Sequence, residues 1–262
     1  MQRVTVQDLV YYQFDRFAIS GPGLVHGCFT RLGGVSRPPW QSLNTGHGVG
    51  DDPDHVRENH VRICRALGIR RADLVSPHQV HSAVVRVVDG RDRGRVCEQT
   101  DALVTDTPGV YLMLRFADCV PVLFHDPVRR VVGLAHAGWR GTVACIARAT
   151  VGWMVEAFGC RPADIRAGIG PSIGPCCYEV GDEVVGAARE AFPDAPYLLE
   201  RQANGRWHFD LWAANRYQLA TEGVKEMQVS GLCTSCRTDE WFSHRAEQGR
   251  TGRLGAVIGL RE

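Results

Sequence analysis

Short apolar runs, separated by glycine, proline and aspartate, recur along most of the chain. Their length and their content of β-branched residues are typical of buried β-strands. We expect strands at Leu24–Thr30, Ala83–Val88, Val110–Phe116, Val120–Phe124, Val131–Ala135, Ile165–Ile169 and Ala256–Leu260.

Four other segments repeat apolar residues with the period of an amphipathic helix. Asp210 precedes the last of these segments, Leu211–Glu222, as an expected N-cap, and Gly223 follows that segment as an expected C-cap. The strands come in clusters and do not alternate strictly with helices. This pattern favours a mixed-sheet α/β sandwich over a doubly wound sheet. The expected helices are Pro53–Leu67, Thr142–Phe158, Asp182–Ala191 and Leu211–Glu222.

The composition is that of an ordinary soluble domain, with 44% hydrophobic and 23% charged residues among 262. The net charge of +1 gives no reason to expect a nucleic-acid partner. No apolar run is long enough to predict a membrane span, and the N-terminus lacks the pattern of a signal peptide. We therefore expect a cytoplasmic protein whose ten cysteines are mostly free thiols.

The segment His136–Thr142 contains the most informative residues. It follows an apolar strand and precedes a helical pattern, so it forms a strand-to-helix turn. Glycines in such a turn allow the backbone to approach a ligand, and the start of a helix offers unpaired N–H groups to an anion. Arg140 adds a fixed, forked cation. We predict that Arg140 contacts an anionic ligand.

His81, Cys119 and His136 each stand at the border of an apolar strand, far apart in the sequence. Dispersed ligands of this kind suit a catalytic zinc site with three protein ligands and one open position. The same residues also suit a Cys119 nucleophile with His136 as its base, oriented by Asp118 or His81. A third interpretation is that they are hydrogen-bonded core residues. Their spacing alone favours the interpretation as hydrogen-bonded core residues.

Other cysteines and histidines carry weaker signals. Cys233 and Cys236 form a lone CxxC, which we expect to be incidental because no second pair stands at finger spacing. Cys176 and Cys177 are expected to be packing residues. His244 belongs to no motif and is expected to be an ordinary surface or core histidine.

With these residues in view, the chain resembles the laccase-domain family, once named multicopper polyphenol oxidases and now assigned as bacterial purine nucleoside phosphorylases. The resemblance covers nearly the whole chain, and its motifs occur in the order of the family. They are Thr30–Ser36, Ser42–Asn44, Gly50–Pro53, Gln79–His81, Ala117–Cys119, His136–Gly141, Ile169–Pro171, Tyr178–Gly181 and Thr251–Arg253.

The chain departs from the family at three positions. His47 stands one place earlier than the family's histidine, and His60 replaces an arginine. The usual Ser-Tyr-Arg-Arg reads Ser243–Ala246, with His244 at the tyrosine position and Ala246 in place of the second arginine.

The resemblance implies one α/β sandwich domain over residues 1–262, with zinc held by His81, Cys119 and His136. The implied activities are phosphorolysis of adenosine, inosine, guanosine and methylthioadenosine, and deamination of adenosine. Some relatives are instead described as editing a peptidoglycan precursor. The fold also resembles that of toxin deamidases with a Cys–His dyad, which keeps a hydrolase as an alternative.

We therefore expect a zinc-dependent enzyme that acts on a nucleoside and phosphate. Arg140 is expected to hold the phosphate, and Arg31 and Asn44 are candidate ribose or phosphate contacts. Asp118 is expected to support the metal ligands or act as a base, although Arg31 and Asp118 equally suit structural ion pairs. Copper-dependent oxidation of phenols is the least favoured activity, because His-x-His motifs are absent from the sequence.

Overall fold

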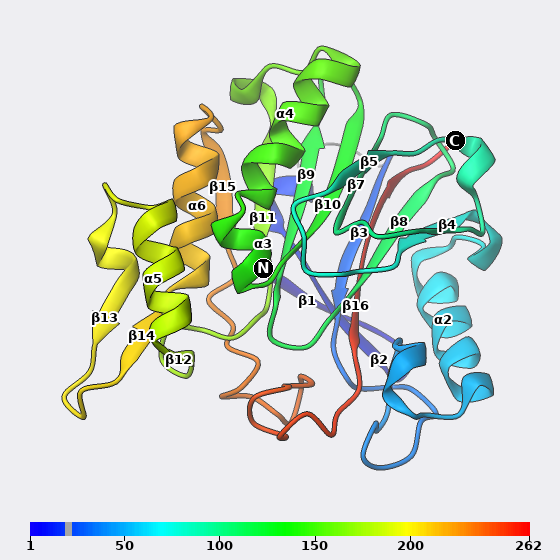
Figure 1. The fold of residues 1–262 in the computed structure, drawn as a ribbon. Coiled ribbons are helices and arrows are strands. Elements are labelled where there is room, and N and C mark those ends of the chain that lie inside the picture. The colour runs from blue at the N-terminus through cyan, green and yellow to red at the C-terminus, as the bar shows by residue number, and fades with distance from the viewer. Residues whose placement is uncertain (19–22) are drawn as a thin grey trace.

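Two β-sheets form the centre of the protein (Figure 1). The structure is a computed structural model that describes residues 1–18 and 23–262. The larger sheet has seven strands in the order β1-β2-β3-β16-β8-β4-β6. Its strands are β1 (Gln2–Val6), β2 (Leu9–Gln13), β3 (Leu24–Phe29), β4 (Leu74–Pro77), β6 (Val96–Cys97), β8 (Tyr111–Phe116) and β16 (Leu254–Leu260).

The second sheet has six strands in the order β15-β11-β9-β10-β7-β5. The pairs β11–β15 and β5–β7 are parallel and the others antiparallel, so this sheet is mixed, as the clustered strands predict. Its strands are β5 (Val85–Val87), β7 (Ala102–Thr105), β9 (Val120–Asp126), β10 (Val131–Ala137), β11 (Arg166–Ile169) and β15 (Glu226–Val229). A small third sheet contains β12 (Glu179–Val180), β14 (Trp207–Phe209) and β13 (Leu199–Arg201).

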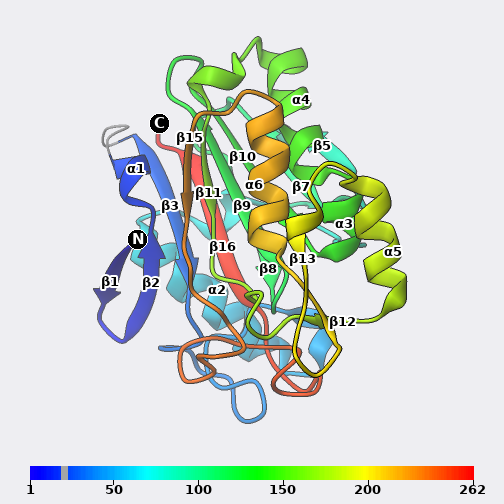
Figure 2. The ribbon, with the colours of Figure 1, turned by 90° about the vertical axis from the view of Figure 1, so that its left-hand side faces the viewer.

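Helices cover the outer faces of both large sheets. Figures 1 and 2 show α2 on one side of the paired sheets, and α4 and α6 on the other. The described α-helices are α1 (Asp15–Ala18), α2 (Pro53–Leu67), α3 (Trp139–Val143), α4 (Ile146–Phe158), α5 (Asp182–Ala191) and α6 (Leu211–Thr221). The 3₁₀ turns are η1 (His47–Val49), η2 (Arg71–Asp73), η3 (Gly90–Asp92), η4 (Pro162–Asp164) and η5 (Pro196–Leu198).

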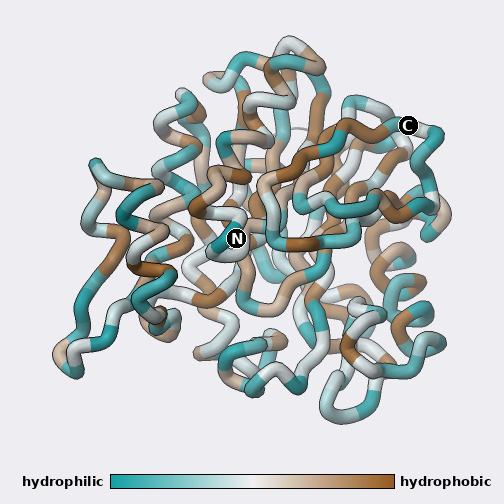
Figure 3. The backbone as a smooth tube through the Cα atoms, viewed as in Figure 1, coloured by the Kyte–Doolittle hydropathy of each residue, from teal (hydrophilic) through white to brown (hydrophobic). Residues whose placement is uncertain are grey.

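This layering divides the core into three apolar clusters. Leu114 of β8, Leu123 of β9 and Leu134 of β10 are fully buried in the cluster between the sheets. The other two clusters lie under the helices, beneath α2 and beneath α4 and α6. Figure 3 accordingly shows hydrophobic residues concentrated along the central strands. Side chains alternate between two faces along a strand, so His136 of β10 shares the inner face with Leu134.

The apolar pattern predicts the principal elements well. All seven predicted strands are present, with ends shifted by up to two residues. The N-cap prediction is also confirmed, because Asp210 accepts a hydrogen bond from the backbone N–H of Ala213 at 2.9 Å. Gly223 lies just beyond the C-cap with a φ of 89°. The likeness to toxin deamidases stays a prediction.

The predicted continuous helix over Thr142–Phe158 is wrong. The chain forms α3 and α4 instead, separated at Cys145, whose φ of 61° cannot continue a helix. Gln218 of α6 donates to the carbonyl oxygen of Thr142 at 2.8 Å. In a continuous helix that oxygen would accept from Ile146; here it accepts from the backbone N–H of Cys145 at 3.0 Å and from Gln218, so a tertiary contact supports the break.

The connections between the sheets position the candidate site. Residues 78–84 join β4 to β5, residues 98–101 join β6 to β7, and residues 117–119 join β8 to β9. The strands β4, β6 and β8 are parallel, so all three connections leave the larger sheet at one edge, here called the crossover edge. β10 also ends there, because Ala137 pairs with Val120 at the start of β9.

In the described part of the chain, no helix is long and apolar enough to cross a membrane.

Candidate active site

Three predicted site residues meet at the crossover edge. His81 and Cys119 lie on two of the connections, and His136 lies near the end of β10. Their ligand atoms all lie within 4.8 Å of one another. The two imidazole rings meet edge to face, with centroids 4.9 Å apart. His136 is buried, Cys119 half-buried and His81 exposed, so the group opens toward solvent on one side.

A fourth residue, Asp101, orients this group and was missed by the sequence analysis. Its side chain is fully buried, and one carboxylate oxygen lies 2.9 Å from Nδ1 of His136. The same carboxylate accepts hydrogen bonds from the backbone N–H groups of Val80, His81 and Ser82. Asp101 therefore fixes the His136 ring and the backbone of the His81 connection together. Its only sequence signal is a position just before the short buried strand β7.

The electrostatics of the group favour a thiolate beside an imidazolium. Burial raises the pKa of the Cys119 thiol, but the charge of His136 and hydrogen bonds from both histidines outweigh burial and bring the pKa to about 6. Burial lowers the pKa of His136, yet Cys119 and Asp101 raise it to about 9. Burial likewise opposes ionisation of Asp101, but hydrogen bonds from His136 and Ser82 bring its pKa down to about 2.

The backbone around the group is tightly constrained. His81 and Asp118 have φ values of 62° and 80°, in the left-handed region that non-glycine residues rarely adopt. Gly138 follows β10, and a Cβ atom at this position would lie 2.8 Å from Sγ of Cys119 and 3.2 Å from Cδ2 of His81. Only glycine leaves room for the Cys119 sulfur there, which explains one of the two glycines in the strand-to-helix turn.

Two cavities meet at this group. The larger one, of about 650 Å³, is lined by His81, Cys119 and His136 together with His47, Arg115 and other residues. The smaller one, of about 210 Å³, is lined by Cys119 together with Asp118, Arg140 and other residues. His81, Cys119 and His244 line both cavities, so a ligand in either one would reach the thiol. His244 is exposed, as expected of a surface histidine, and in addition it lines both cavities.

Arg140 and Asp118 flank Cys119 in the smaller cavity. The Arg140 guanidinium stacks on the Trp139 ring at 4.2 Å and lies 3.7 Å from the carboxylate of Glu183. More than half of its side chain is exposed, so it remains open to an incoming anion. Asp118 is buried, and its oxygens accept hydrogen bonds from the hydroxyl of Thr234 and the backbone N–H of Arg245, both at 2.6 Å.

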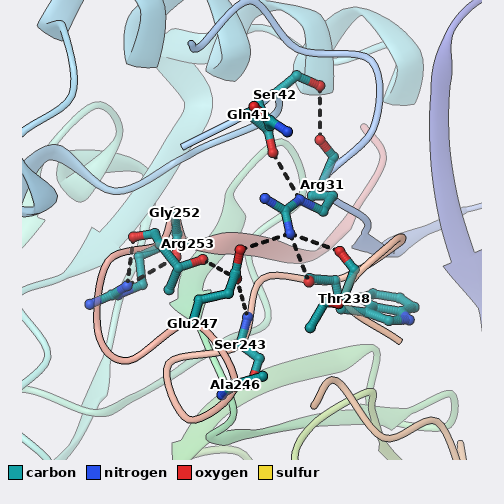
Figure 4. Close-up of polar contacts among 11 residues, drawn as sticks. Arg31, Gln41, Ser42, Thr238, Ser243, Ala246, Glu247, Gly252 and Arg253 are labelled. Carbon is teal, nitrogen blue, oxygen red and sulfur yellow. Dashed lines mark hydrogen bonds and ion pairs between the residues drawn. The ribbon is translucent and has the colours of Figure 1, made fainter. Parts of the chain in front are cut away.

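Arg31 and Asn44 are bonded to protein groups and do not line either cavity. Arg31 donates to the carbonyl oxygens of Gln41 and Thr238 and forms an ion pair with Glu247 at 3.0 Å (Figure 4). This ion pair matches the structural interpretation of Arg31. The Asn44 side chain is buried and bonds both Asp51 and the backbone N–H of Arg253. Contacts of Arg31 and Asn44 with ribose or phosphate stay predictions.

Two further arginines line the larger cavity: Arg253, which ends the motif Thr251–Arg253, and Arg115, which the sequence analysis did not single out. Arg115 and Arg253 bond backbone carbonyl oxygens of Pro77, Thr251 and Gly252. Burial lowers the pKa of both guanidinium groups, although arginine stays charged at any physiological pH. The larger cavity therefore has a cationic wall suited to polar or anionic groups of a ligand.

The donor set of His81, Cys119 and His136 fits a zinc ion. Two imidazole nitrogens and a thiolate are among the preferred ligands of zinc, and three protein ligands are typical of catalytic zinc. Asp101 holds Nδ1 of His136 and leaves Nε2 available for ligation. A carboxylate behind a ligating histidine is the usual supporting contact in such sites.

A family model described as multi-copper polyphenol oxidoreductase laccase matches residues 25–261. The chain belongs to this family. Purine nucleoside phosphorylase YlmD of Geobacillus stearothermophilus is 43% identical over 254 residues, covering 92% of this chain and 91% of the relative. Adenosine deaminase RL5, from an unknown prokaryotic organism, is 37% identical over 247 residues, and the match covers 90% of this chain and 94% of that relative.

The fold of this chain is also closely similar to that of a relative of known structure. The crystal structure of YlmD from Geobacillus stearothermophilus superposes with a TM-score of 0.93 at 40% identity. The match covers 99% of this chain and 98% of that chain. The family resemblance predicted from the sequence motifs is therefore confirmed, and the relatives compared here bear the names of enzymes.

The first prediction concerns Gly138. We expect Gly138→Ala to lower the free energy of unfolding by about 1–3 kcal/mol, because the new methyl group overlaps the Cys119 sulfur. Gly152→Ala in α4 is the matched control and should be as stable as wild type or up to about 1 kcal/mol more stable, because its Cβ would meet nothing within 4 Å and a helix favours alanine over glycine. Urea denaturation of both variants measures the effect. Equal stabilities of the two variants would show that the packing at Gly138 is not limiting.

The second prediction concerns the Cys119 thiol in protein stripped of metal by a chelator. Its alkylation by iodoacetamide should increase with pH around a midpoint of about 6, because the thiolate is the reactive form. Between pH values of about 6 and 9, thiolate and imidazolium coexist. In Asp101→Asn the midpoint should rise, because the His136 charge loses its carboxylate partner. Mass spectrometry of the modified peptide gives the rates, and a wild-type midpoint near the ordinary value of about 8.5 contradicts the prediction.

Proposed function

We propose that this protein is a zinc-dependent purine nucleoside phosphorylase that also deaminates adenosine and cleaves methylthioadenosine. The observation that carries the proposal is the convergence of His81, Cys119 and His136 where two cavities meet. The larger cavity, of about 650 Å³, is of the size that small-molecule sites have. The printed names of the relatives, which include a phosphorylase and a deaminase, support the same activities.

The two cavities suit the two substrates of phosphorolysis. We place the nucleoside in the larger cavity, where Arg115 and Arg253 offer N–H donors to its oxygen and nitrogen acceptors. Phosphate is placed beside Arg140 in the smaller cavity. A phosphate oxygen would then bond to ribose C1′ as the bond from C1′ to the purine nitrogen breaks. His244 borders both cavities and is the proposed source of the proton that the departing purine takes up.

Zinc bound by His81, Cys119 and His136 would supply an open coordination position and activate water, as deamination of adenosine requires. Asp101 would keep His136 oriented through Nδ1. Asp118 is proposed as a positioning residue for Cys119, because both of its oxygens accept hydrogen bonds from neighbouring loops. The proposed location is the cytoplasm, where a thiolate ligand stays reduced.

Arg31 and Asn44 remain proposed ribose or phosphate contacts. Support comes from their neighbours: Asn44 bonds the backbone of Gly46 and Arg253, both in the wall of the larger cavity. Arg31 is ion-paired with Glu247, which in turn accepts from the backbone N–H of Ser243, next to His244. A substitution of either residue would therefore change the shape of the cavity wall and so weaken substrate binding.

A second candidate is a cysteine hydrolase acting on a wall precursor. The lowered pKa of Cys119 beside His136 favours it, because a thiolate is the nucleophile of such enzymes. It requires a covalent bond between Sγ of Cys119 and the substrate, whereas phosphorolysis requires none.

The third prediction tests the reaction. Incubated with adenosine and phosphate, the protein should yield adenine and ribose 1-phosphate, with inosine and ammonia from deamination. Chelation and Cys119→Ala should each abolish both reactions, because both remove the metal centre, which would activate water for deamination and help to orient the substrates of phosphorolysis. Chromatography of the products gives the result. Activity that survives both treatments overturns the zinc assignment, and a covalent adduct on Cys119 with a wall precursor would favour the hydrolase.

The fourth prediction separates phosphate binding from catalysis. Arg140→Gln should raise the KM for phosphate about ten- to a hundredfold, because it removes a charged hydrogen bond of about 1.5–3 kcal/mol. Deamination of adenosine should be unchanged, since it uses no phosphate. Arg148→Gln on α4, where Arg148 pairs with Glu222, is the control. If Arg115→Gln or Arg253→Gln raises this KM and Arg140→Gln does not, phosphate binds in the larger cavity.

A further inference from the structure

Four cysteines converge at a second place, outside the candidate active site. Cys176 and Cys177 follow β11, and Cys233 and Cys236 follow β15. The sulfur atoms of this four-cysteine cluster all lie within 4.8 Å of one another. The expectations of an incidental CxxC and of two packing cysteines considered each pair in isolation, whereas the structure brings the two pairs together.

The sheet explains why the two pairs meet. β11 and β15 are parallel neighbours, and Ile169 at the end of one strand is opposite Val229 at the end of the other. The loops that follow leave the sheet side by side, and a parallel bridge continues between Ser172 and Cys233. Residues nearly 60 positions apart in the chain are thus brought together by strand register, which no local spacing rule detects.

The sulfur geometry fits one tetrahedral metal ion. Zinc–sulfur bonds of about 2.3 Å in a tetrahedron place the sulfur atoms about 3.8 Å apart. In the cluster, Sγ of Cys236 lies 3.6 Å from that of Cys176 and 3.3 Å from that of Cys177. Both separations are far longer than a disulfide bond of about 2.05 Å, and all ten cysteines are free thiols. A disulfide would also join only one of these two sulfurs to Cys236.

The surroundings of the cluster suit thiolate ligands. The backbone N–H of Gly174 donates to Sγ of Cys233 at 3.2 Å, a contact that favours the deprotonated sulfur. The guanidinium of Arg245 donates to the carbonyl oxygens of Cys177 and Glu179, which places a positive charge beside the cluster. Four sulfur ligands in a tetrahedron select zinc among the common divalent ions.

We infer that Cys176, Cys177, Cys233 and Cys236 bind a second zinc ion, with a structural role distinct from the candidate active site. A closed site of four protein ligands has no open position for substrate. The ion would hold the β11 and β15 loops together. Both loops contact Asp118 beside Cys119: the backbone N–H of Ile173 donates to its carbonyl oxygen, and the Thr234 hydroxyl donates to its carboxylate.

The fifth prediction is a metal count on the full chain, purified without a metal-binding tag, under reducing conditions and without added metal. Wild type should hold two zinc ions per chain by elemental analysis. The double variant His81→Ala, Cys119→Ala should keep one, and Cys233→Ser, Cys236→Ser should lose one. Cys145→Ser, which changes a half-buried cysteine outside both groups, is the control and should keep the wild-type count.

The two metal proposals fail in different ways. If only the active-site zinc is wrong, wild type holds one ion, which the active-site variant keeps and the cluster variant loses. The cluster assignment is overturned if the cluster variant keeps the wild-type count, if iron replaces zinc, or if thiol titration of denatured, chelator-treated wild type shows fewer than ten free thiols.

A spectroscopic measurement keeps the test decisive if the cluster variant does not fold. Cobalt is exchanged into the folded His81→Ala, Cys119→Ala protein, where only the cluster remains to bind it. The absorption should show tetrahedral cobalt with thiolate charge-transfer bands of an intensity expected for four sulfur ligands. Absorption bands of octahedral cobalt, or a complete absence of thiolate charge-transfer bands, would overturn the assignment.

Discussion

The buried carboxylate of Asp101 is the constraint on which the candidate site depends. It bonds the ring of His136 on β10 and three successive backbone N–H groups of the His81 connection. A buried ionised group is tolerable only when such partners surround it. Removing the carboxylate would leave those donors unsatisfied and release two of the three site segments from each other. The thiolate and imidazolium of Cys119 and His136 can persist beside each other because Asp101 stabilises the imidazolium.

The candidate active site and the four-cysteine cluster lie near the crossover edge for one topological reason. Chain segments that pass between the two sheets must turn at the ends of the strands, and the parallel strands β4, β6 and β8 end together. β11 is antiparallel to β9, so its end lies beside the start of β9, next to Cys119. The loops that follow β11 and β15 therefore contact Asp118 directly. Local stability of the four-cysteine cluster and the position of Cys119 are thus physically linked.

Sequence pattern predicts what local forces decide. The strands and the helix Pro53–Leu67 follow from apolar period and capping, and family motifs point to His81, Cys119 and His136. Contacts between distant segments are not encoded in this way. Asp101 stands in no motif, His244 departs from the family's residue, and the break at Cys145 is supported by a bond from α6. The four-cysteine cluster depends on the register of two strands, so its halves look unrelated in the sequence.

Charge balance explains why one constellation suits both a metal and a cysteine–histidine pair. With His136 protonated, Asp101 and Cys119 carry two negative charges against one positive charge, all within a largely buried site. A divalent cation in place of the proton on Nε2 of His136 would neutralise the site. Uncompensated buried charge is costly, so the same charges that hold the pair together are also compatible with a divalent cation. The Asp101 carboxylate serves both arrangements, because it stabilises the imidazolium of the pair and would hold Nδ1 of a metal-bound His136.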